Sequence, residues 1–172
     1  TFMGAHDVPP EFKNNRNQYI DLICNKMLPY VAEHQLAEFC DVFCDEGYFT
    51  VIESEKILIR AVELGLKPKI HADELACVDA AELALNTKSY SADHLLHISE
   101  KSIIDFGQTN IVATLLPGTA YTLRLPYAPA RKLIDQGAIV ALASDCNPGS
   151  CLTENMQLIM SLACMNMNMS VE

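Results

Sequence analysis

The sequence predicts an α/β protein built on a parallel sheet. Short apolar runs alternate along the 172 residues with segments whose apolar residues recur at helical spacing. The runs are continuous inside, as in Ile139–Leu142, which is typical of strands covered on both faces. A strand followed by a helix, repeated about six times, favours parallel pairing.

Six segments are expected to be strands, and the segments between them carry helical apolar stripes. The expected strands are Thr1–Ala5, Phe39–Cys44, Pro68–Ala72, Tyr90–Asp93, Asn110–Leu116 and Ala138–Ala143. We expect the helices to start at N-caps Ser99 and Thr153 and at Pro129 as a first helical residue. We expect helix ends at Gly65, Gly107 and Gly137, and a kink at Pro29.

The six units predict part of a TIM-type (β/α)8 barrel, in which residues 1–172 form part of one barrel domain. A closed barrel needs roughly 250 residues, so about two strands and their helices are missing. The chain begins at Thr1 inside an expected strand, and we therefore expect an excerpt of a longer chain. A doubly wound open sheet is the rival fold, but neither GxGxxG nor GxxxxGK[ST] occurs.

The composition favours an enzyme that acts on a small molecule. The formal net charge of −10 argues against nucleic acid or an anionic membrane as a partner. No apolar run approaches the roughly 20 residues of a membrane span. The seven cysteines include no CxxC pair, which favours free core thiols in the cytoplasm over a structural zinc site.

Side chains that can carry chemistry follow the carboxyl ends of the expected strands, where parallel barrels hold their active sites. These residues are His6, Asp45, Glu46, His71, Asp73, Glu74, Asp93, His94, His97, Asp145, Asn147 and Gly149. This distribution predicts a catalytic site at one end of the sheet.

The clusters around His71 and His94 have a catalytic and an ordinary interpretation. His71 ends its strand and could bind a metal, while Glu74 could transfer protons or hold a substrate amide. His94 could stabilise an oxyanion or act as a base, with Asp93 or a neighbour fixing its tautomer. The ordinary alternative is a pair of strand-end histidines beside solvated acids, and we favour it for His97.

The third cluster follows the last expected strand. Asp145 is costly to bury unless it is paired or binds a metal, and it could also accept a proton from a bound water. Asn147 and the backbone near Gly149 could bind a carboxylate or a ring carbonyl. The alternative is an ordinary Asp-Asn-Pro-Gly turn. Histidine, histidine and aspartate on three strands describe a metal-dependent hydrolase, although only His71 and Asp145 emerge as metal ligands.

These motifs resemble the imidazolonepropionase family of the amidohydrolase superfamily, along essentially the whole chain. The matching segments are Gly-Ala-His6-Asp-Val-Pro-Pro, Lys-Ile-His71-Ala-Asp-Glu74, Ser-Ala-Asp-His94-Leu, Leu-Leu-Pro-Gly and Ala-Ser-Asp145-Cys-Asn-Pro-Gly-Ser. The second and the last segment indicate only the superfamily. The first segment points to this member of it.

The resemblance implies hydrolysis of the cyclic amide of 4-imidazolone-5-propanoate to N-formimidoyl-L-glutamate in histidine breakdown. It implies one zinc or iron ion bound by His71 and Asp145. It implies catalytic roles for Glu74, His94 and Asp145. The implied substrate-binding residues are His6, Glu74, Asn147, Gly149 and Ser150. It further implies a cytoplasmic enzyme that is a homodimer at full length.

The chain also departs from the family pattern. The family's His-x-His pair, a substrate-binding Arg and Tyr, and a small β-domain have no counterpart in these residues. Three alternatives stay open: another cyclic amidohydrolase, a deaminase of the same superfamily, or a non-catalytic barrel fragment that binds a small anion.

Overall fold

The computed structural model describes residues 1–170 as one six-stranded parallel sheet in which each strand pairs with the next. The predicted domain, 1–172, extends two residues beyond the described part. The strands are β1 (Phe2–Ala5), β2 (Phe39–Cys44), β3 (Lys67–Ala72), β4 (Ser91–His94), β5 (Val112–Leu115) and β6 (Ile139–Leu142). All six predicted strands are therefore confirmed, with ends that differ by two residues at most.

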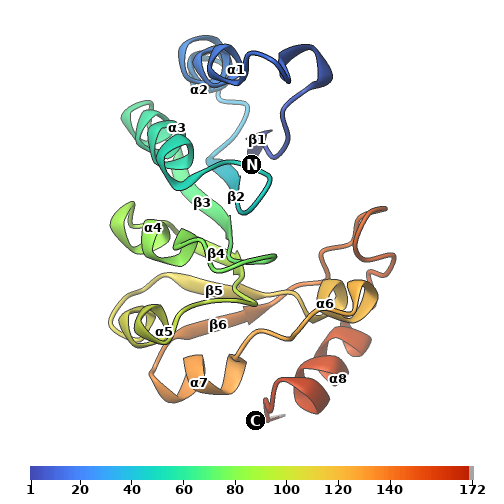
Figure 1. Cartoon of the computed structure of the whole chain (residues 1–172). Coiled ribbons are helices and arrows are strands. Elements are labelled where there is room, and N and C mark those ends of the chain that lie inside the picture. Colours follow the sequence, from blue (N-terminus) through green and yellow to red (C-terminus); the bar gives the residue numbers. More distant parts are fainter. Residues whose placement is uncertain (171–172) are drawn as a thin grey trace.

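Helices follow each strand and cover the outside of the sheet (Figure 1). They are α1 (Arg16–Leu22), α2 (Leu28–Glu33), α3 (Val51–Glu63), α4 (Ala80–Asn86), α5 (Glu100–Phe106), α6 (Pro117–Leu123), α7 (Ala130–Asp135) and α8 (Met156–Asn166), with a 3-10 turn at Pro10–Phe12 and a π-helical turn at Ile23–Met27. α6 and α8 pack against each other beside the carboxyl end of β5 (Figure 1).

The two faces of the sheet differ in chemistry because successive side chains of a strand point to opposite sides. In β2, Cys40, Val42 and Cys44 are fully buried, and they belong to the main hydrophobic core together with Ile57 and Leu58 of α3. The alternate residues of the central strands are largely polar and include Asp41, Lys69, His71, Ser91 and Asp93. The helix-covered face therefore holds the fold together, and the other face carries the polar groups.

The sheet is open in the described part of the chain. β1 pairs only with β2, and β6 only with β5, so neither edge is joined to the other. An open, curved, all-parallel sheet with helices on its outer side is the expected form of a partial barrel.

Most of the predicted helix ends are confirmed. Pro29 lies in the first turn of α2, directly after the π-helical turn. Ser99 caps α5 by accepting a hydrogen bond from the backbone N–H of Ser102. Gly65 and Gly137 have φ values of +86° and +89°, the left-handed conformation in which glycine meets no Cβ clash.

Two predicted helix starts are wrong. Asn155, not Thr153, caps α8, because its side chain accepts the hydrogen bond from Leu158 N. The Thr153 hydroxyl instead accepts from Asn155 N and so holds the preceding turn. Pro129 is the N-cap of α7, and the helix begins one residue later, at Ala130.

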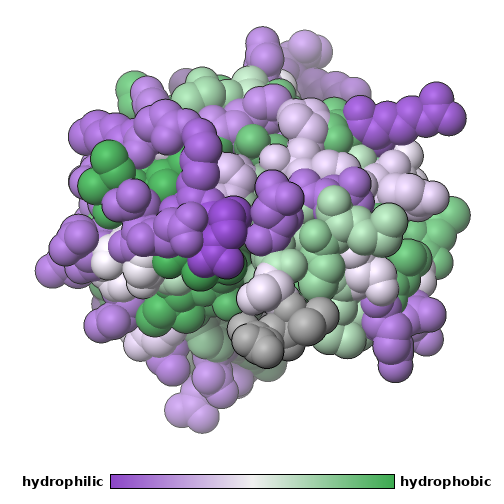
Figure 2. All heavy atoms as spheres, turned by 90° about the horizontal axis from the view of Figure 1, so that it is seen from below, coloured by the Kyte–Doolittle hydropathy of each residue, from purple (hydrophilic) through white to green (hydrophobic). Residues whose placement is uncertain are grey.

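The cysteines and surface agree with the composition. All seven cysteines are free, and four of them, Cys24, Cys40, Cys44 and Cys151, are buried. No helix within residues 1–170 is long and apolar enough to cross a membrane. Figure 2 shows hydrophobic patches interspersed with hydrophilic residues on the surface seen from below. Met160 and Met165 of α8 are among the exposed hydrophobic residues.

The start of α3 offers a test of local stability. The Thr50 hydroxyl accepts a hydrogen bond from Glu53 N, and the Glu53 carboxylate accepts one from Thr50 N. Thr50→Ala should lower the free energy of unfolding by about 1 kcal/mol, because it leaves a backbone donor of the first turn without its cap. Urea denaturation measures the loss. Thr50→Ser keeps the hydroxyl and should retain most of the stability; an equal loss in both variants would contradict the role of the cap.

Candidate active site

All eight predicted site residues line one pocket of about 490 Å³ at the carboxyl ends of the strands. They are His6, His71, Glu74, His94, Asp145, Asn147, Gly149 and Ser150, and the pocket is completed by Met3, Phe43, Tyr48, Leu75 and Leu123. The residues come from four separate stretches of the chain, so the parallel sheet alone brings them together. Their individual roles stay predictions.

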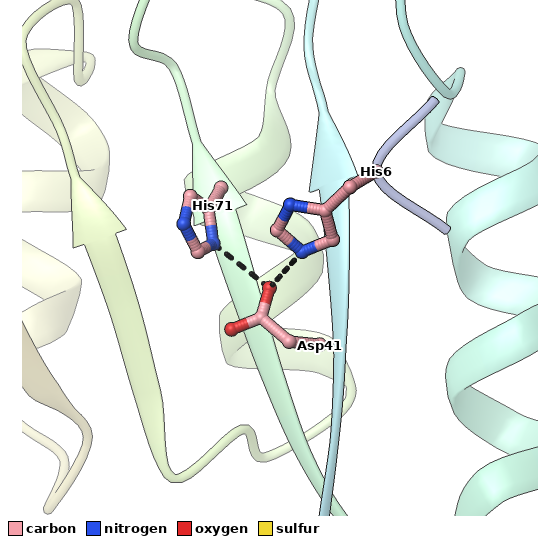
Figure 3. A group of neighbouring side chains, drawn as sticks. All are labelled: His6, Asp41 and His71. Atoms are coloured by element: carbon pink, nitrogen blue, oxygen red, sulfur yellow. Dashed lines mark hydrogen bonds and ion pairs between the residues drawn. The ribbon is translucent and has the colours of Figure 1, made fainter. Parts of the chain in front are cut away.

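Three histidines form a row across the pocket. The ring centres of His6 and His71 are 4.6 Å apart, and those of His71 and His94 are 5.1 Å apart. Asp41 of β2 joins the first two: its Oδ1 lies 2.8 Å from His71 Nδ1 and 3.1 Å from His6 Nε2 (Figure 3).

Asp41 is an ionised carboxylate in this arrangement. Burial alone would raise its pKa, but the hydrogen bonds from His6 and His71 outweigh burial and hold the pKa well below its ordinary value. An ionised carboxylate only accepts hydrogen bonds, so His71 Nδ1 and His6 Nε2 are the donors. Burial lowers the pKa of His71, but the hydrogen bond to Asp41 and the nearby charges of Asp93 and Asp145 raise it overall.

Glu74 and His94 are buried beside each other at the pocket. Burial, with the nearby charge of Asp145, raises the pKa of Glu74 to about 7. Burial and the neighbouring His71 lower the pKa of His94 to about 3, so this imidazole is neutral at neutral pH. His94 Nε2 lies 3.5 Å from Glu74 Oε2, and its buried Nδ1 has no hydrogen-bond partner among residues 1–170.

The loop that carries Glu74 is fixed by two buried carboxylates. Asp45 accepts hydrogen bonds from the backbone N–H groups of Glu74, Leu75 and Ala76. Asp73 accepts from Val78, Ala80 and Ala81 at the start of α4. Asp45 and Asp73 therefore act on the backbone of the loop, whereas Glu46 is exposed.

The loop after β6 is organised around Asp145 and Asn147. Thr119 Oγ1 and Ser150 Oγ lie 2.5 and 3.3 Å from Asp145 Oδ2, so Oδ1 is the oxygen left for a ligand. The Asn147 amide is occupied within the loop: its nitrogen donates to Asp145 O and Ser150 Oγ, and its oxygen accepts from Gly149 N and Ser150 N. Asn147 thus shapes this loop in addition to lining the pocket.

Three residues at this end of the sheet have left-handed backbone conformations, as do others elsewhere, such as Gln35 and Lys88. Asp73, His94 and Asp145 have φ values of +49°, +77° and +52°, which non-glycine residues rarely adopt. Such conformations persist where surrounding contacts hold them, and they cluster at functional sites.

The donor atoms fit a cation. His71 donates through Nδ1 to Asp41, which leaves Nε2, on the other side of the ring, as the free ligand atom (Figure 3). A histidine whose second nitrogen donates to a carboxylate is the common arrangement of metal-bound imidazole. Asp145 Oδ1 supplies an oxygen in the same pocket.

A second arrangement of donors is present at Asp41. Ligand atoms of His6, Asp41 and His71 all lie within 4.8 Å of one another. Those contacts are already hydrogen bonds of 2.8 and 3.1 Å, so a cation held by all three would have to displace both protons. We therefore interpret this trio as a hydrogen-bonded network behind the pocket.

Asp41, Thr119 and Lys69 are the site residues that sequence reasoning missed. An acidic residue inside the otherwise apolar strand Phe39–Cys44 was the available signal, since such a residue needs a partner when buried. Of the two partners expected for His94, Asp93 or a neighbour, the structure shows the neighbour. Asp93 binds Ser91 Oγ and Lys69 Nζ, and the neighbour that contacts His94 is Glu74.

A second pocket, of about 530 Å³, lies at the amino ends of β4 and β5. It is lined by Leu85, Lys88, Ser89, Tyr90, Thr109, Asn110, Ile111 and Val112. It contains neither a carboxylate nor an imidazole, so the chemistry belongs to the opposite end of the sheet.

Comparison with known structures agrees with the barrel fold. A guanine deaminase from C. acetobutylicum with bound guanine superposes with a TM-score of 0.69 at 14% identity, over 95% of this chain and 43% of that one. An adenosine deaminase from Xanthomonas campestris with bound zinc gives 0.67 at 13% identity, over 88% and 37%. An amidohydrolase from a Sargasso Sea sample gives 0.65 at 13% identity, over 94% and 40%. The open sheet therefore has the fold of part of a TIM-type barrel.

Sequence comparison is more specific. No family model matches the chain. The imidazolonepropionase of Clostridium tetani is 51% identical over 172 residues, which are 100% of this chain and 41% of that protein. The imidazolonepropionase of Phocaeicola vulgatus is 51% identical over 171 residues, or 99% and 41%. The chain thus spans about two fifths of the length of these relatives. Along its whole length, it is a homologue of part of the proteins named imidazolonepropionase.

Proposed function

We propose that the full-length protein hydrolyses the cyclic amide of 4-imidazolone-5-propanoate to N-formimidoyl-L-glutamate. The observation that carries this proposal is the convergence of the eight predicted residues in one pocket of a chain that is 51% identical to named imidazolonepropionases. We further propose that the enzyme is a cytoplasmic homodimer and that this small molecule is its substrate.

His71 Nε2 and Asp145 Oδ1 would hold one zinc or iron ion. Such an ion supplies polarisation of the scissile carbonyl and a lower pKa for the attacking water. Further ligands would come from a His-x-His pair, which the resemblance implies and these residues do not contain. Thr119 and Ser150, through Oδ2, keep the Asp145 carboxylate turned in one direction.

Asp145 and Glu74 would transfer protons, and His94 would stabilise the developing charge. Asp145 would accept a proton from the water that attacks the ring carbonyl. The neutral imidazole of His94 would donate a hydrogen bond to the oxygen on which negative charge develops. Glu74, with a pKa near 7, would deliver a proton to the ring nitrogen as the amide C–N bond breaks.

Substrate recognition would use both ends of the pocket. Asn147, Gly149 and Ser150 line the pocket together with His6, and their amide and hydroxyl groups would exchange hydrogen bonds within the loop for bonds to the substrate. These groups would bind the propanoate carboxylate and orient the ring. The apolar wall of Phe43, Tyr48 and Leu75 would exclude water from the ring.

Metal content and turnover test this function directly. The full-length protein should contain zinc or iron by elemental analysis and hydrolyse 4-imidazolone-5-propanoate. His71→Ala and Asp145→Ala should lose the metal and lower turnover by on the order of a thousandfold, because each removes a ligand. Metal without turnover of this substrate would move the enzyme to another ring substrate. A folded full-length protein without metal would contradict the hydrolase mechanism.

Glu74→Gln should lower kcat by about a hundred- to ten-thousandfold, since the amide cannot transfer a proton. In the wild type, kcat should fall as the pH rises through about 7, because Glu74 then loses the proton that it delivers. A pH–rate profile of both proteins checks this. A limb near pH 7 that persists in Glu74→Gln would assign the titration to another group.

The same substitution should stabilise the fold at higher pH. The pKa of Glu74 is about 7 in the folded protein and near 4.5 as an ordinary glutamate, so the folded state binds the extra proton between these values. Stability contributed by that proton is present below pH 4.5 and lost as the pH rises through 7. Glu74→Gln should thus gain on the order of 1–3 kcal/mol over the wild type at pH 8. It should gain little at pH 4, as urea denaturation can show.

A further inference from the structure

One oxygen of Asp41 connects two histidines that come from different parts of the chain. His6 follows β1 and His71 lies in β3, and both rings direct a nitrogen at Asp41 Oδ1 from 3.1 and 2.8 Å (Figure 3). The side chain of Asp41 is 2% exposed, so water cannot replace either bond freely. The carboxylate therefore fixes which nitrogen of each ring carries the proton.

The layer beneath the histidines holds Asp41 in place. The register of the strands puts Lys69 of β3 opposite Asp41 of β2 on one side and Ser91 of β4 on the other. Lys69 Nζ lies 3.9 Å from Asp41 Oδ2 and 3.2 Å from Asp93 Oδ2, and Asp93 also accepts from Ser91 Oγ. The second oxygen of Asp41 thus faces a cation, and the first is left to the histidines.

Asp41 lies on the face of the sheet opposite the helix-covered core. The core on the helix-covered face is apolar, and a buried charge on the other face costs free energy unless it is paired. What the charge does is orient two rings whose remaining nitrogens, His71 Nε2 and His6 Nδ1, are left to ligands at the pocket.

We propose that Asp41 is a positioning residue that fixes the tautomers and the mutual orientation of His6 and His71. The metal ligand and the substrate-binding histidine then act as one unit. This inference rests on the proposed function for the roles of the two histidines, but the orientation itself does not depend on the substrate.

The test compares Asp41→Asn with Asp21→Asn in the full-length protein. Asparagine keeps the shape and one acceptor oxygen but removes the charge that orders both rings. Asp21→Asn removes the same charge from an exposed residue of α1 that pairs with Lys56 and does not line the pocket. In Asp41→Asn, the zinc dissociation constant should rise by about 10- to 100-fold, the range found when the carboxylate behind a metal-bound histidine is lost. KM should rise with it, while Asp21→Asn stays within a few-fold of the wild type.

A spectroscopic measurement separates this inference from the proposed activity. Nitrogen NMR of the metal-free protein at alkaline pH should find the proton of His71 on Nδ1 and that of His6 on Nε2. Asp41→Asn should mix the tautomers of both rings. Unchanged tautomers and zinc affinity in Asp41→Asn would overturn the inference, as would equal losses in Asp21→Asn. Locked tautomers and normal zinc binding without turnover would leave the inference standing and reject the proposed substrate.

Discussion

The parallel register of β2, β3 and β4 decides where polar side chains can lie in this protein. Because every strand runs in the same direction, residues two apart on one strand share a face with their partners on the next. The apolar alternates pack under the helices, and the polar alternates are stacked in layers on the opposite face: Asp41, Lys69 and Ser91 in one layer, Phe43, His71 and Asp93 in the next. The loops at the carboxyl ends extend this polar stack into the pocket.

Backbone N–H groups and imidazoles that are buried at the carboxyl ends of the strands need hydrogen-bond acceptors. Three buried carboxylates supply them. Asp45 and Asp73 satisfy six backbone N–H groups of the loop after β3, and Asp41 accepts from two imidazoles. These hydrogen bonds fix the loop that includes Asp73, whose φ is +49°.

The sequence predicts the strands well because burial on both faces leaves unbroken apolar runs such as Ile139–Leu142. It also predicts that His71, Glu74, His94 and Asp145 meet, since strand ends of a parallel sheet share one edge. It does not reveal which partner each side chain chooses. Asp41 lies in a strand whose other residues are apolar, and its role depends on hydrogen bonds to histidines 35 and 30 residues away. Thr153 and Asn155 are both suitable N-cap residues, and the sequence does not distinguish them. In the structure, the Thr153 hydroxyl accepts from Asn155 N, and the Asn155 side chain caps α8.

The described part of the pocket carries negative charge. Asp41 is held as a carboxylate by its two histidines, Asp145 presents a carboxylate, and the chain carries a formal charge of −10. No lysine or arginine lines the pocket among the described residues, and Lys69 below it is engaged by Asp93 and Asp41. These carboxylates would oppose the entry of an anionic ligand, and a cation held by His71 and Asp145 would offset part of that charge.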